Sequence, residues 1–313
     1  VVMETGSVYS LDDATWKTEE EKLRHGLDVI KRLQNAYGED VRIFIFPWQA
    51  IGDIYMAGRY LKAYIEKIEK EKSLQPGTLN YVITVMGNVR KKVAMTCGYE
   101  KIEVLLPEES KNLCRAVVFL GYKETNAEIL QHRFSYTNRI WKLGNYKKIN
   151  FDDHFRYSIY GLSEDSPVVV PNLREDQAAI DKIFAENQLI PGKTVIIAPY
   201  ANTIANPSPE FWEKLVEELK NAGYTVCTNS GGAEEPAIKG TLPVLFPFDI
   251  TISAIEHAGC FIGLRSGLCD YVAAAKAKKM GSTRAAASME KAAELYPMAV
   301  FAAGNAPTAL LKL

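Results

Sequence analysis

Short, continuous apolar runs, each followed by a turn and a helical pattern, recur along the chain, and this alternation constrains the fold more than any other feature. Residues 41–47 (VRIFIFP) form one such run, and 79–87 (LNYVITVMG) and 101–107 (KIEVLLP) repeat it after intervening helical patterns. Strands that are apolar on both sides are typical of parallel sheets covered by helices. The alternation therefore predicts an α/β fold with right-handed crossover connections.

The alternation stops and then starts again, which predicts two domains. A polar passage marked by prolines fills residues 161–193, and strand-like runs resume with KTVIIAPYA at 193–201. A chain of 313 residues is long enough for two cores, at roughly 150 residues per domain. We expect an N-terminal domain of residues 1–170 and a C-terminal domain of residues 171–313, each with a Rossmann-like parallel sheet.

Helix signals lie between the runs. The apolar spacing and the Gly, Pro and Ser signals predict helices at 11–37, 54–74, 88–98, 208–223, 252–259 and 268–279. Further strands are expected at 224–232 and 260–267. Residues 115–160 combine an apolar run with an aromatic and basic stretch, and we expect mixed helix there. From residue 281 the chain is unusually rich in alanine; a plain helix is the simplest interpretation, and we place no motif in it.

Composition excludes several classes of function. The 37 basic and 38 acidic residues give a net charge of −1, so nothing global favours nucleic acid. No run approaches the roughly 18 apolar residues of a membrane span, and no signal peptide pattern is present. The five cysteines form no CxxC pair, which favours a reducing cytosol. The four histidines lie far apart, so we expect no zinc site.

The loop PWQAIGDIY (47–55) carries the main candidate of the first half. Ligands of open parallel sheets bind beyond the carboxyl ends of the strands, where helix N-termini face the crevice. Gly52 allows a tight turn or a close backbone approach. Asp53, just before a long helix, has two interpretations: a helix N-cap with a purely structural role, or a base that faces a ligand.

Three loops of the second half follow predicted strands in the same way: 199–206 (PYANTIAN), 229–235 (NSGGAEE) and 264–270 (LRSGLCD). Small and hydroxyl residues in such loops let main-chain donors approach a phosphate closely. These residues are Asn202, Thr203, Ser230, Gly231, Gly232, Ser266 and Gly267. Arg265 adds a fork-shaped cation that matches diphosphate oxygens. Together the loops predict a nucleotide or anion site, although each glycine alone also suits a plain turn.

Other candidates have a functional and a structural interpretation. Glu234 suits hydrogen bonds from a ribose, or the solvated start of a helix. Phe248 suits a place beside a nucleobase, or core packing. The basic run RKK at 90–92 suits an anionic acceptor, or a solvated helix face. Cys269 has no neighbour that would activate a thiolate, so we expect it to pack.

Several stretches resemble the ADP-heptose:lipopolysaccharide heptosyltransferases of glycosyltransferase family 9. They are VRIFIFPWQAIGDIYMAGRYL, YVITVMGNVRKKVAMTCGYEKIEVLLP and the run from KTVIIAPYANTIANPSPEFW to GLRSGLCDYVAAA, in about residues 41–107 and 190–280. The resemblance implies a GT-B fold, with two Rossmann-like domains whose parallel sheets face a central cleft. It implies an acceptor on the N-terminal domain and a sugar nucleotide on the C-terminal domain.

The resemblance also implies chemistry. In the family, the acid of the N-terminal Gly-Asp turn is the proposed catalytic base, and it falls on Asp53 here. An inverting transfer needs one carboxylate to take the proton of the acceptor hydroxyl. The leaving nucleoside diphosphate needs cations or N–H donors rather than a proton. The chain lacks the Asp-x-Asp motif of metal-dependent transferases, so we expect no metal and no cofactor, the nucleotide sugar being a substrate.

The chain departs from the family pattern at the donor turn. There the family has Asp-Ser/Thr-Gly and then His, whereas this chain has Arg265, Ser266, Gly267, Leu268, Cys269 and Asp270. The lysine before the family's Trp-Pro has no counterpart in IANPSPEFW. The donor sugar therefore stays open, and Arg265 takes the place of the missing cation.

The sequence predicts an inverting, metal-independent glycosyltransferase of polysaccharide biosynthesis. Its partners are a nucleotide-diphosphate sugar and a glycan or glycolipid acceptor, with no nucleic acid. It is expected in the cytoplasm, with association at the inner face of the membrane left open. Two alternatives remain: a sugar-nucleotide epimerase, and a non-catalytic binding or assembly subunit on the same fold.

Overall fold

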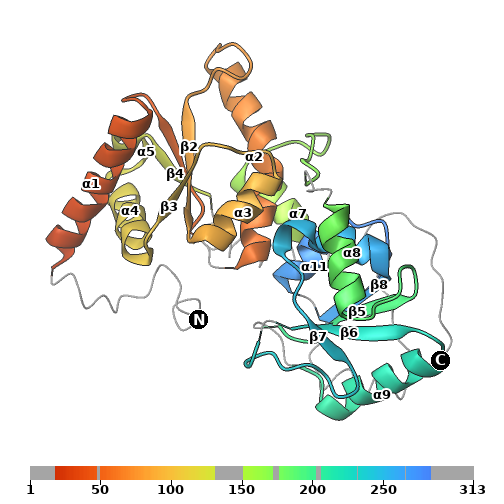
Figure 1. Ribbon diagram of the computed structural model, residues 1–313. Coiled ribbons are helices and arrows are strands. Elements are labelled where there is room, and N and C mark those ends of the chain that lie inside the picture. Colours follow the sequence, from red (N-terminus) through yellow and green to blue (C-terminus); the bar gives the residue numbers. More distant parts are fainter. Residues whose placement is uncertain are drawn as a thin grey trace. The chain divides into compact units, whose positions relative to one another are not determined.

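The structure is a computed structural model of the chain, and it describes residues 18–47, 50–130, 151–171, 176–201, 206–230, 232–264 and 266–282. The chain divides into two compact units, Val1–Asn172 and Leu173–Leu313. Each unit has a parallel sheet with helices packed against it (Figure 1). The predicted α/β class with a parallel sheet in each half is confirmed.

The sheet of the first unit has four parallel strands in the order β3-β2-β1-β4. They are β1 (Arg42–Ile45), β2 (Tyr81–Met86), β3 (Ile102–Leu105) and β4 (Ala127–Ile129). Ile43 pairs with Val82 on one side and with Ala127 on the other. The expectation of mixed helix throughout 115–160 was wrong at β4, because a strand of three residues gives too short an apolar run to be recognised.

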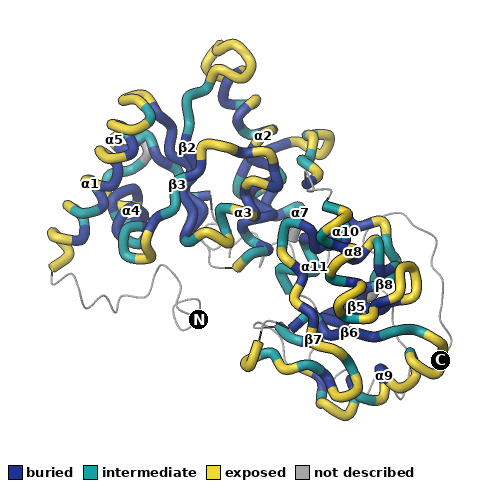
Figure 2. The backbone as a smooth tube through the Cα atoms, viewed as in Figure 1, coloured by how far each residue is buried: buried dark blue, intermediate teal, exposed yellow. Residues whose placement is uncertain are grey.

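The helices of the first unit cover both faces of this sheet. They are α1 (Glu19–Tyr37), α2 (Ile51–Glu71), α3 (Asn88–Thr96), α4 (Pro107–Leu120), α5 (Tyr122–Thr125), α7 (Phe151–Asp153) and the π-helix η1 (His154–Ile159). The apolar sides of α1 and α4 pack against Ile43 and Ile45 of β1 and form one core. Tyr64 of α2 contacts the Phe44 ring, whose side chain points to the opposite face. Every residue of β1 is buried, and Figure 2 shows that the neighbouring strand β2 is buried along most of its length.

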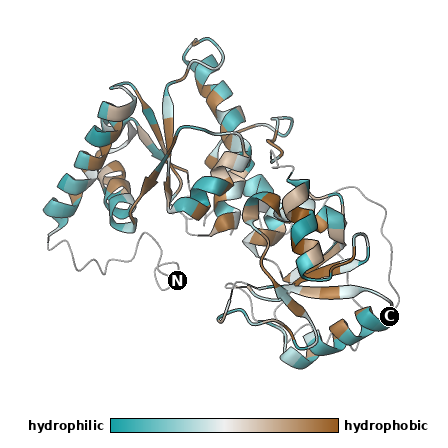
Figure 3. Ribbon diagram, viewed as in Figure 1, coloured by the Kyte–Doolittle hydropathy of each residue, from teal (hydrophilic) through white to brown (hydrophobic). Residues whose placement is uncertain are grey.

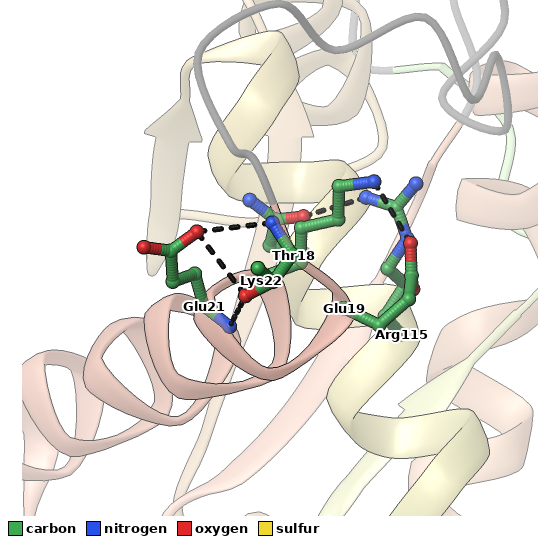
Figure 4. Close-up of polar contacts among 6 residues, drawn as sticks. Thr18, Glu19, Glu21, Lys22 and Arg115 are labelled. Carbon is green, nitrogen blue, oxygen red and sulfur yellow. Dashed lines mark hydrogen bonds and ion pairs between the residues drawn. The ribbon is translucent and has the colours of Figure 1, made fainter.

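The pair of helices α1 and α4 is held closely. A Cβ atom on Gly26 of α1 would lie 2.1 Å from the Asn112 carbonyl oxygen of α4. At the start of α1, Thr18 and Glu21 form a reciprocal capping box (Figure 4). In the same view Glu19 lies 2.8 Å from Lys22 Nζ and 3.8 Å from the Arg115 Nε of α4. Polar contacts at the helix start thus supplement the apolar packing.

The sheet of the second unit has five parallel strands in the order β7-β6-β5-β8-β9. They are β5 (Thr194–Ala198), β6 (Thr225–Asn229), β7 (Leu242–Val244), β8 (Gly259–Leu264) and β9 (Lys278–Ser282). The helix expected at 268–279 was wrong in its second half, because Lys278–Ser282 pairs with β8 from Cys260 to Leu264. Alanine and lysine favour helices, but pairing with a sheet edge overrides this intrinsic propensity.

The helices of the second unit are α8 (Gln177–Glu186), α9 (Pro209–Asn221), the 3₁₀-helix η2 (Phe248–Ile250), α10 (Thr251–Ala258) and α11 (Gly267–Val272). The Ser208 hydroxyl caps α9 by accepting from the Phe211 N–H, and Pro209 is its first residue. This helix ends just before Gly223, whose φ of +85° suits glycine. Helix α8 lies within residues 161–193, the polar passage from which the domain boundary was predicted.

Hydropathy follows the layers of each unit. Apolar residues make up most of the central strand β5, and the long helices alternate polar and apolar faces (Figure 3). Within the described part of the chain, every helix is too short or too polar to cross a membrane.

Candidate functional site

Both sheets change direction beside their first strand, and this topology locates the candidate sites. In each unit the chain moves outward from the first strand through the second and third, and then returns to the other side of the first strand. The reversal lies between β1 and β4 in the first unit and between β5 and β8 in the second. Ligands of such sheets bind beyond the carboxyl ends of the strands at this point. The loops selected from the sequence follow β1, β5 and β8.

Asp53 lies in the first turn of α2, directly after β1. The helix begins at Ile51, and Ala50 is its N-cap residue, with φ −75° and ψ 130°. The prediction that Gly52 forms the turn and that Asp53 precedes the helix was therefore wrong, because the helix begins about one turn earlier than predicted. Gly52 is buried as the second helical residue, and Asp53, the third, is partly exposed. The N-cap interpretation of Asp53 is excluded, although a carboxylate in the first turn still interacts favourably with the helix dipole.

Arg90 occupies the matching place on the neighbouring strand. β2 pairs with β1, and Gly87, with φ +80°, leads from β2 into α3. Arg90 is the third residue of α3, and burial lowers the pKa of its guanidinium. A cation in the first turn of a helix is opposed by the helix dipole, so this position has an electrostatic cost. In the basic run, Arg90 is partly buried and Lys92 is exposed. Arg90 is therefore the candidate for binding an anionic group, whereas Lys92 lies on the solvated face of the helix.

In the second unit, the turn between β8 and α11 carries five candidates. Ser266 is the N-cap residue of α11 in an extended conformation, with φ −141° and ψ 174°. Gly267, Leu268 and Asp270 form the first turn of the helix and are partly exposed. The Cys269 thiol donates to the Leu264 carbonyl oxygen at 2.8 Å, so it packs within the turn as expected.

The loops after β5 and β6 are tied together. The Tyr200 hydroxyl donates to the Pro236 carbonyl oxygen, and Asn206 Oδ1 accepts from the Ala201 N–H at 3.1 Å. Four of the predicted site residues, which are Asn202, Thr203, Gly231 and Arg265, lie outside the described residues.

The Ser230 hydroxyl makes hydrogen bonds within its own turn. Its hydroxyl donates to the Glu235 carbonyl oxygen at 2.5 Å and accepts from the Gly232 N–H at 3.4 Å. Glu234 lies in the same turn and is exposed. The sequence analysis did not select Asn229, the last residue of β6. Its side-chain oxygen is buried without a partner in the described part of the chain, which is a signal that only coordinates provide.

Phe248 reaches α11 from a distant part of the sequence. Its ring stacks on Tyr271, with centroids 4.0 Å apart and planes inclined by 28°. Tyr271 is fully buried, whereas Phe248 at the start of η2 is partly exposed. The structure therefore brings Phe248 beside α11, the helix that begins after Ser266. The roles assigned to these residues stay predictions.

Solved structures with a similar fold are glycosyltransferases. The E. coli ADP-heptose LPS heptosyltransferase II has a TM-score of 0.50 and 11% identity, with 77% of this chain and 84% of that chain covered. The chain shares the fold of this heptosyltransferase. A glycosyltransferase family 9 protein from Veillonella parvula has a TM-score of 0.49 and 12% identity, covering 81% and 90%.

An iron-containing dodecameric glycosyltransferase, TibC from enterotoxigenic E. coli, has a TM-score of 0.46 and 17% identity over 77% of this chain. This chain spans 58% of the length of TibC. At such identities the likeness concerns the fold alone, so the resemblance to heptosyltransferases is confirmed at that level. No curated protein sequence matches the chain.

The end of the chain matches a different family. A model of CbiC, precorrin-8X methylmutase, matches residues 253–313. The first part of this stretch forms most of α10, then β8, α11 and β9. Strands β8 and β9 belong to the parallel sheet of the second unit. The part after residue 282, where the sequence is rich in alanine, lies outside the described residues.

Proposed function

We propose that the chain is an inverting, metal-independent glycosyltransferase that moves a sugar from a nucleotide-diphosphate donor to a saccharide hydroxyl. The observation that carries the proposal is the fold shared with heptosyltransferase II, together with Asp53 in the first helical turn after β1, beside the strand-order reversal. In this proposal residues 1–170 hold the acceptor and residues 171–313 hold the sugar nucleotide.

Asp53 is the general base of the proposed reaction. Its carboxylate takes the proton of the acceptor hydroxyl while the hydroxyl oxygen forms a bond to the anomeric carbon. The bond from that carbon to the diphosphate oxygen breaks, and its electron pair leaves with the diphosphate. Attack from the face opposite the leaving group inverts the anomeric configuration. Such proton removal contributes about 10²–10⁴-fold to the rate.

The second unit stabilises the leaving diphosphate. The N–H groups of the first turn of α11, at Gly267 and Leu268, are suited to anionic oxygens, and Arg265 supplies the cation. Further contacts with the donor sugar nucleotide are proposed for residues of the β5, β6 and β8 loops and for one residue of α2. They are Asn202, Thr203, Ser230, Gly231, Ser266, Asp270 and Gly52. Glu234 accepts hydrogen bonds from the ribose, and the exposed side of Phe248 lies along the nucleobase.

Arg90 is the proposed contact for an anionic group on the acceptor. Its half-buried guanidinium stands on the βα connection next to that of Asp53. The acceptor is a glycan or a glycolipid, and the reaction takes place in the cytoplasm. No cofactor takes part, because the sugar nucleotide is itself a substrate.

The test is a transfer assay with a panel of UDP-, GDP-, ADP- and CMP-sugars. Release of free nucleotide is measured with each donor, with and without a saccharide acceptor and with and without EDTA. The proposal predicts that nucleotide release depends on the acceptor and is unchanged by EDTA. It also predicts that the product, examined by NMR, has the anomeric configuration opposite to that of the donor. Retained configuration or loss of activity in EDTA would contradict the mechanism.

Two other functions predict different results in the same assay. An epimerase interconverts the donor sugar without any acceptor. A non-catalytic binding subunit, which the altered turn at Arg265 motivates, releases no nucleotide but still binds one. A ligand that binds only the folded state raises the thermal midpoint, so the same panel in a thermal shift assay separates binding from turnover.

A further inference from the structure

A π-helix packs against the helix that carries Asp53. In η1 the Tyr160 N–H donates to the Phe155 carbonyl oxygen, five residues earlier, at 3.1 Å. This helix continues directly from α7, and both lie beside α2 (Figure 1). π-helices are rare and occur frequently at functional sites. The contacts that the π-helix makes with α2 are therefore candidates for a functional role.

The side chains of α7 and η1 bind one part of α2. Asp152 accepts hydrogen bonds from Arg59 Nη1 at 2.8 Å and from the Tyr60 hydroxyl. Arg156 Nη2 lies 3.2 Å from the Tyr60 oxygen and 3.5 Å from an Asp152 oxygen. We call these four residues the Asp152 cluster. Burial raises the pKa of Tyr60, so its phenol stays protonated and donates.

The same part of α2 has a second anchor. The buried hydroxyl of Tyr160, which follows η1, donates to the Ala57 carbonyl oxygen at 2.7 Å. Because this carbonyl belongs to the backbone of α2, the bond fixes the helix itself rather than one of its side chains.

Asp152 is the only carboxylate of the cluster, and it separates two cations. The side chains of Arg59, Arg156 and Asp152 are 26%, 16% and 32% exposed. The Nε atoms of both arginines are buried without a hydrogen-bond partner among the described residues. Removal of the carboxylate charge would leave two poorly solvated guanidinium groups together, and they would repel each other.

The cluster acts on the side of α2 that carries Asp53. Tyr60 follows Asp53 by seven residues, which is almost two turns at 3.6 residues per turn, so the two side chains leave the same side of the helix. We propose that Asp152 is a positioning residue for Asp53, a role that rests on the proposed function. By fixing α2 through Tyr60 and Arg59, it sets the rotation of the first turn.

A small rotation is enough to matter. A carboxylate that lies about 6 Å from the helix axis moves by about 1 Å when the helix rotates by about 10°. A misplacement of about 1 Å costs on the order of 10²-fold in rate. Loss of the cluster therefore lowers the rate of transfer without any direct contact between Asp152 and the reacting atoms.

The helix offers a matched control. The Tyr64 hydroxyl donates to Glu128 at 2.9 Å, and Arg42 also binds Glu128, so a tyrosine, an arginine and a carboxylate again meet one turn further along α2. Burial raises the pKa of Tyr64 as it does for Tyr60. The variants Tyr60→Phe and Asp152→Asn test the proposal, and Tyr64→Phe and Glu128→Gln control for the loss of a buried hydrogen bond on the same helix.

The first measurement is steady-state transfer. We expect Tyr60→Phe and Asp152→Asn to lower kcat by about 10²-fold while Kd for the donor is unchanged. Tyr64→Phe and Glu128→Gln are expected to keep kcat near wild type. Equal losses in all four variants, or a loss of donor affinity in the two test variants, would show a merely structural role and overturn the proposal.

The second measurement does not depend on activity. Hydrogen–deuterium exchange of residues 51–58 reports the order of the first two turns of α2. Exchange there is expected to be faster in Tyr60→Phe and Asp152→Asn than in the controls, and equal rates would overturn the proposal. If Asp53→Asn keeps full activity, the proposed function fails, whereas the exchange rates still decide whether the cluster orders the first turns of α2.

Discussion

Replacement of Gly26 by alanine tests the close packing of α1 on α4. The added Cβ would lie 2.1 Å from the Asn112 carbonyl oxygen, 2.7 Å from its carbon and 2.9 Å from the Ala116 Cβ. Two of these atoms are backbone atoms of α4, so no side-chain rotation relieves the clash and the helices must separate. Overpacking of this kind costs about 1–3 kcal/mol.

Helix propensity works in the opposite direction. Alanine is better than glycine inside a helix by about 1 kcal/mol. Because the contacts of 2.1 and 2.7 Å lie far below any normal carbon contact, we expect the cost to reach or exceed the upper end of the overpacking range. The expected net loss is about 2 kcal/mol, which lowers the urea midpoint by about 1 M for m values of about 2 kcal/mol/M.

Gly58→Ala is the matched control. Its Cβ would meet the Cys97 sulfur at 2.8 Å, which is a side-chain atom that can move. Urea unfolding followed by far-UV circular dichroism should rank the midpoints as wild type, then Gly58→Ala, then Gly26→Ala. A midpoint for Gly26→Ala equal to or above wild type would refute the close approach of the two helices.

Three further predictions concern a helix cap, a binding residue and a titrating group. Ser208→Ala removes the N-cap of α9 and should lower stability by about 1 kcal/mol in thermal unfolding; an unchanged midpoint would refute the cap. Arg90→Gln should raise KM for the acceptor with unchanged donor Kd, whereas Lys92→Gln should change neither; equal effects would remove Arg90 from the site. Burial raises the pKa of Glu109, but hydrogen bonds from the Arg32 guanidinium and the Leu106 N–H outweigh it, and the net pKa is lowered from 4.5. A carboxyl whose pKa is lowered by folding stabilises above its unfolded value, so the stability lost in Glu109→Gln should be largest above pH 4.5 and shrink as pH falls below it. A loss independent of pH would show packing alone.

The sequence predicted the elements whose apolar runs are long or whose ends are marked. Strand β5 is buried along its whole length, and α9 has Ser208 and Pro209 at its start and Gly223 after its end. Strands β4 and β7, of three residues each, carry too little pattern. Strand β9 is fixed by pairing with β8 rather than by its own residues, so the alanine and lysine run that leads into it misled the prediction.

The positions of the candidate residues after strand ends were predicted from the sequence, whereas their local details were not. The rule that loops follow strand ends selected Asp53 and the α11 turn, because the order of strand and helix signals is visible in sequence. The start of α2 at Ile51 was not visible, since Ala50 is an N-cap residue without a capping side chain. The stacking of Phe248 on Tyr271 and the cluster at Asp152 join segments far apart in sequence, so no local pattern reveals them.

The most direct test of the central claim is transfer by Asp53→Asn. This variant keeps the size of the side chain and removes the negative charge with which the carboxylate accepts a proton. The proposed mechanism predicts a loss of kcat of about 10²–10⁴-fold, with an unchanged Kd for the sugar nucleotide. Because the first turn of α2 loses a favourable charge, stability falls by only about 0.3–1 kcal/mol. Full transfer activity in this variant would contradict the assignment of Asp53 as the base.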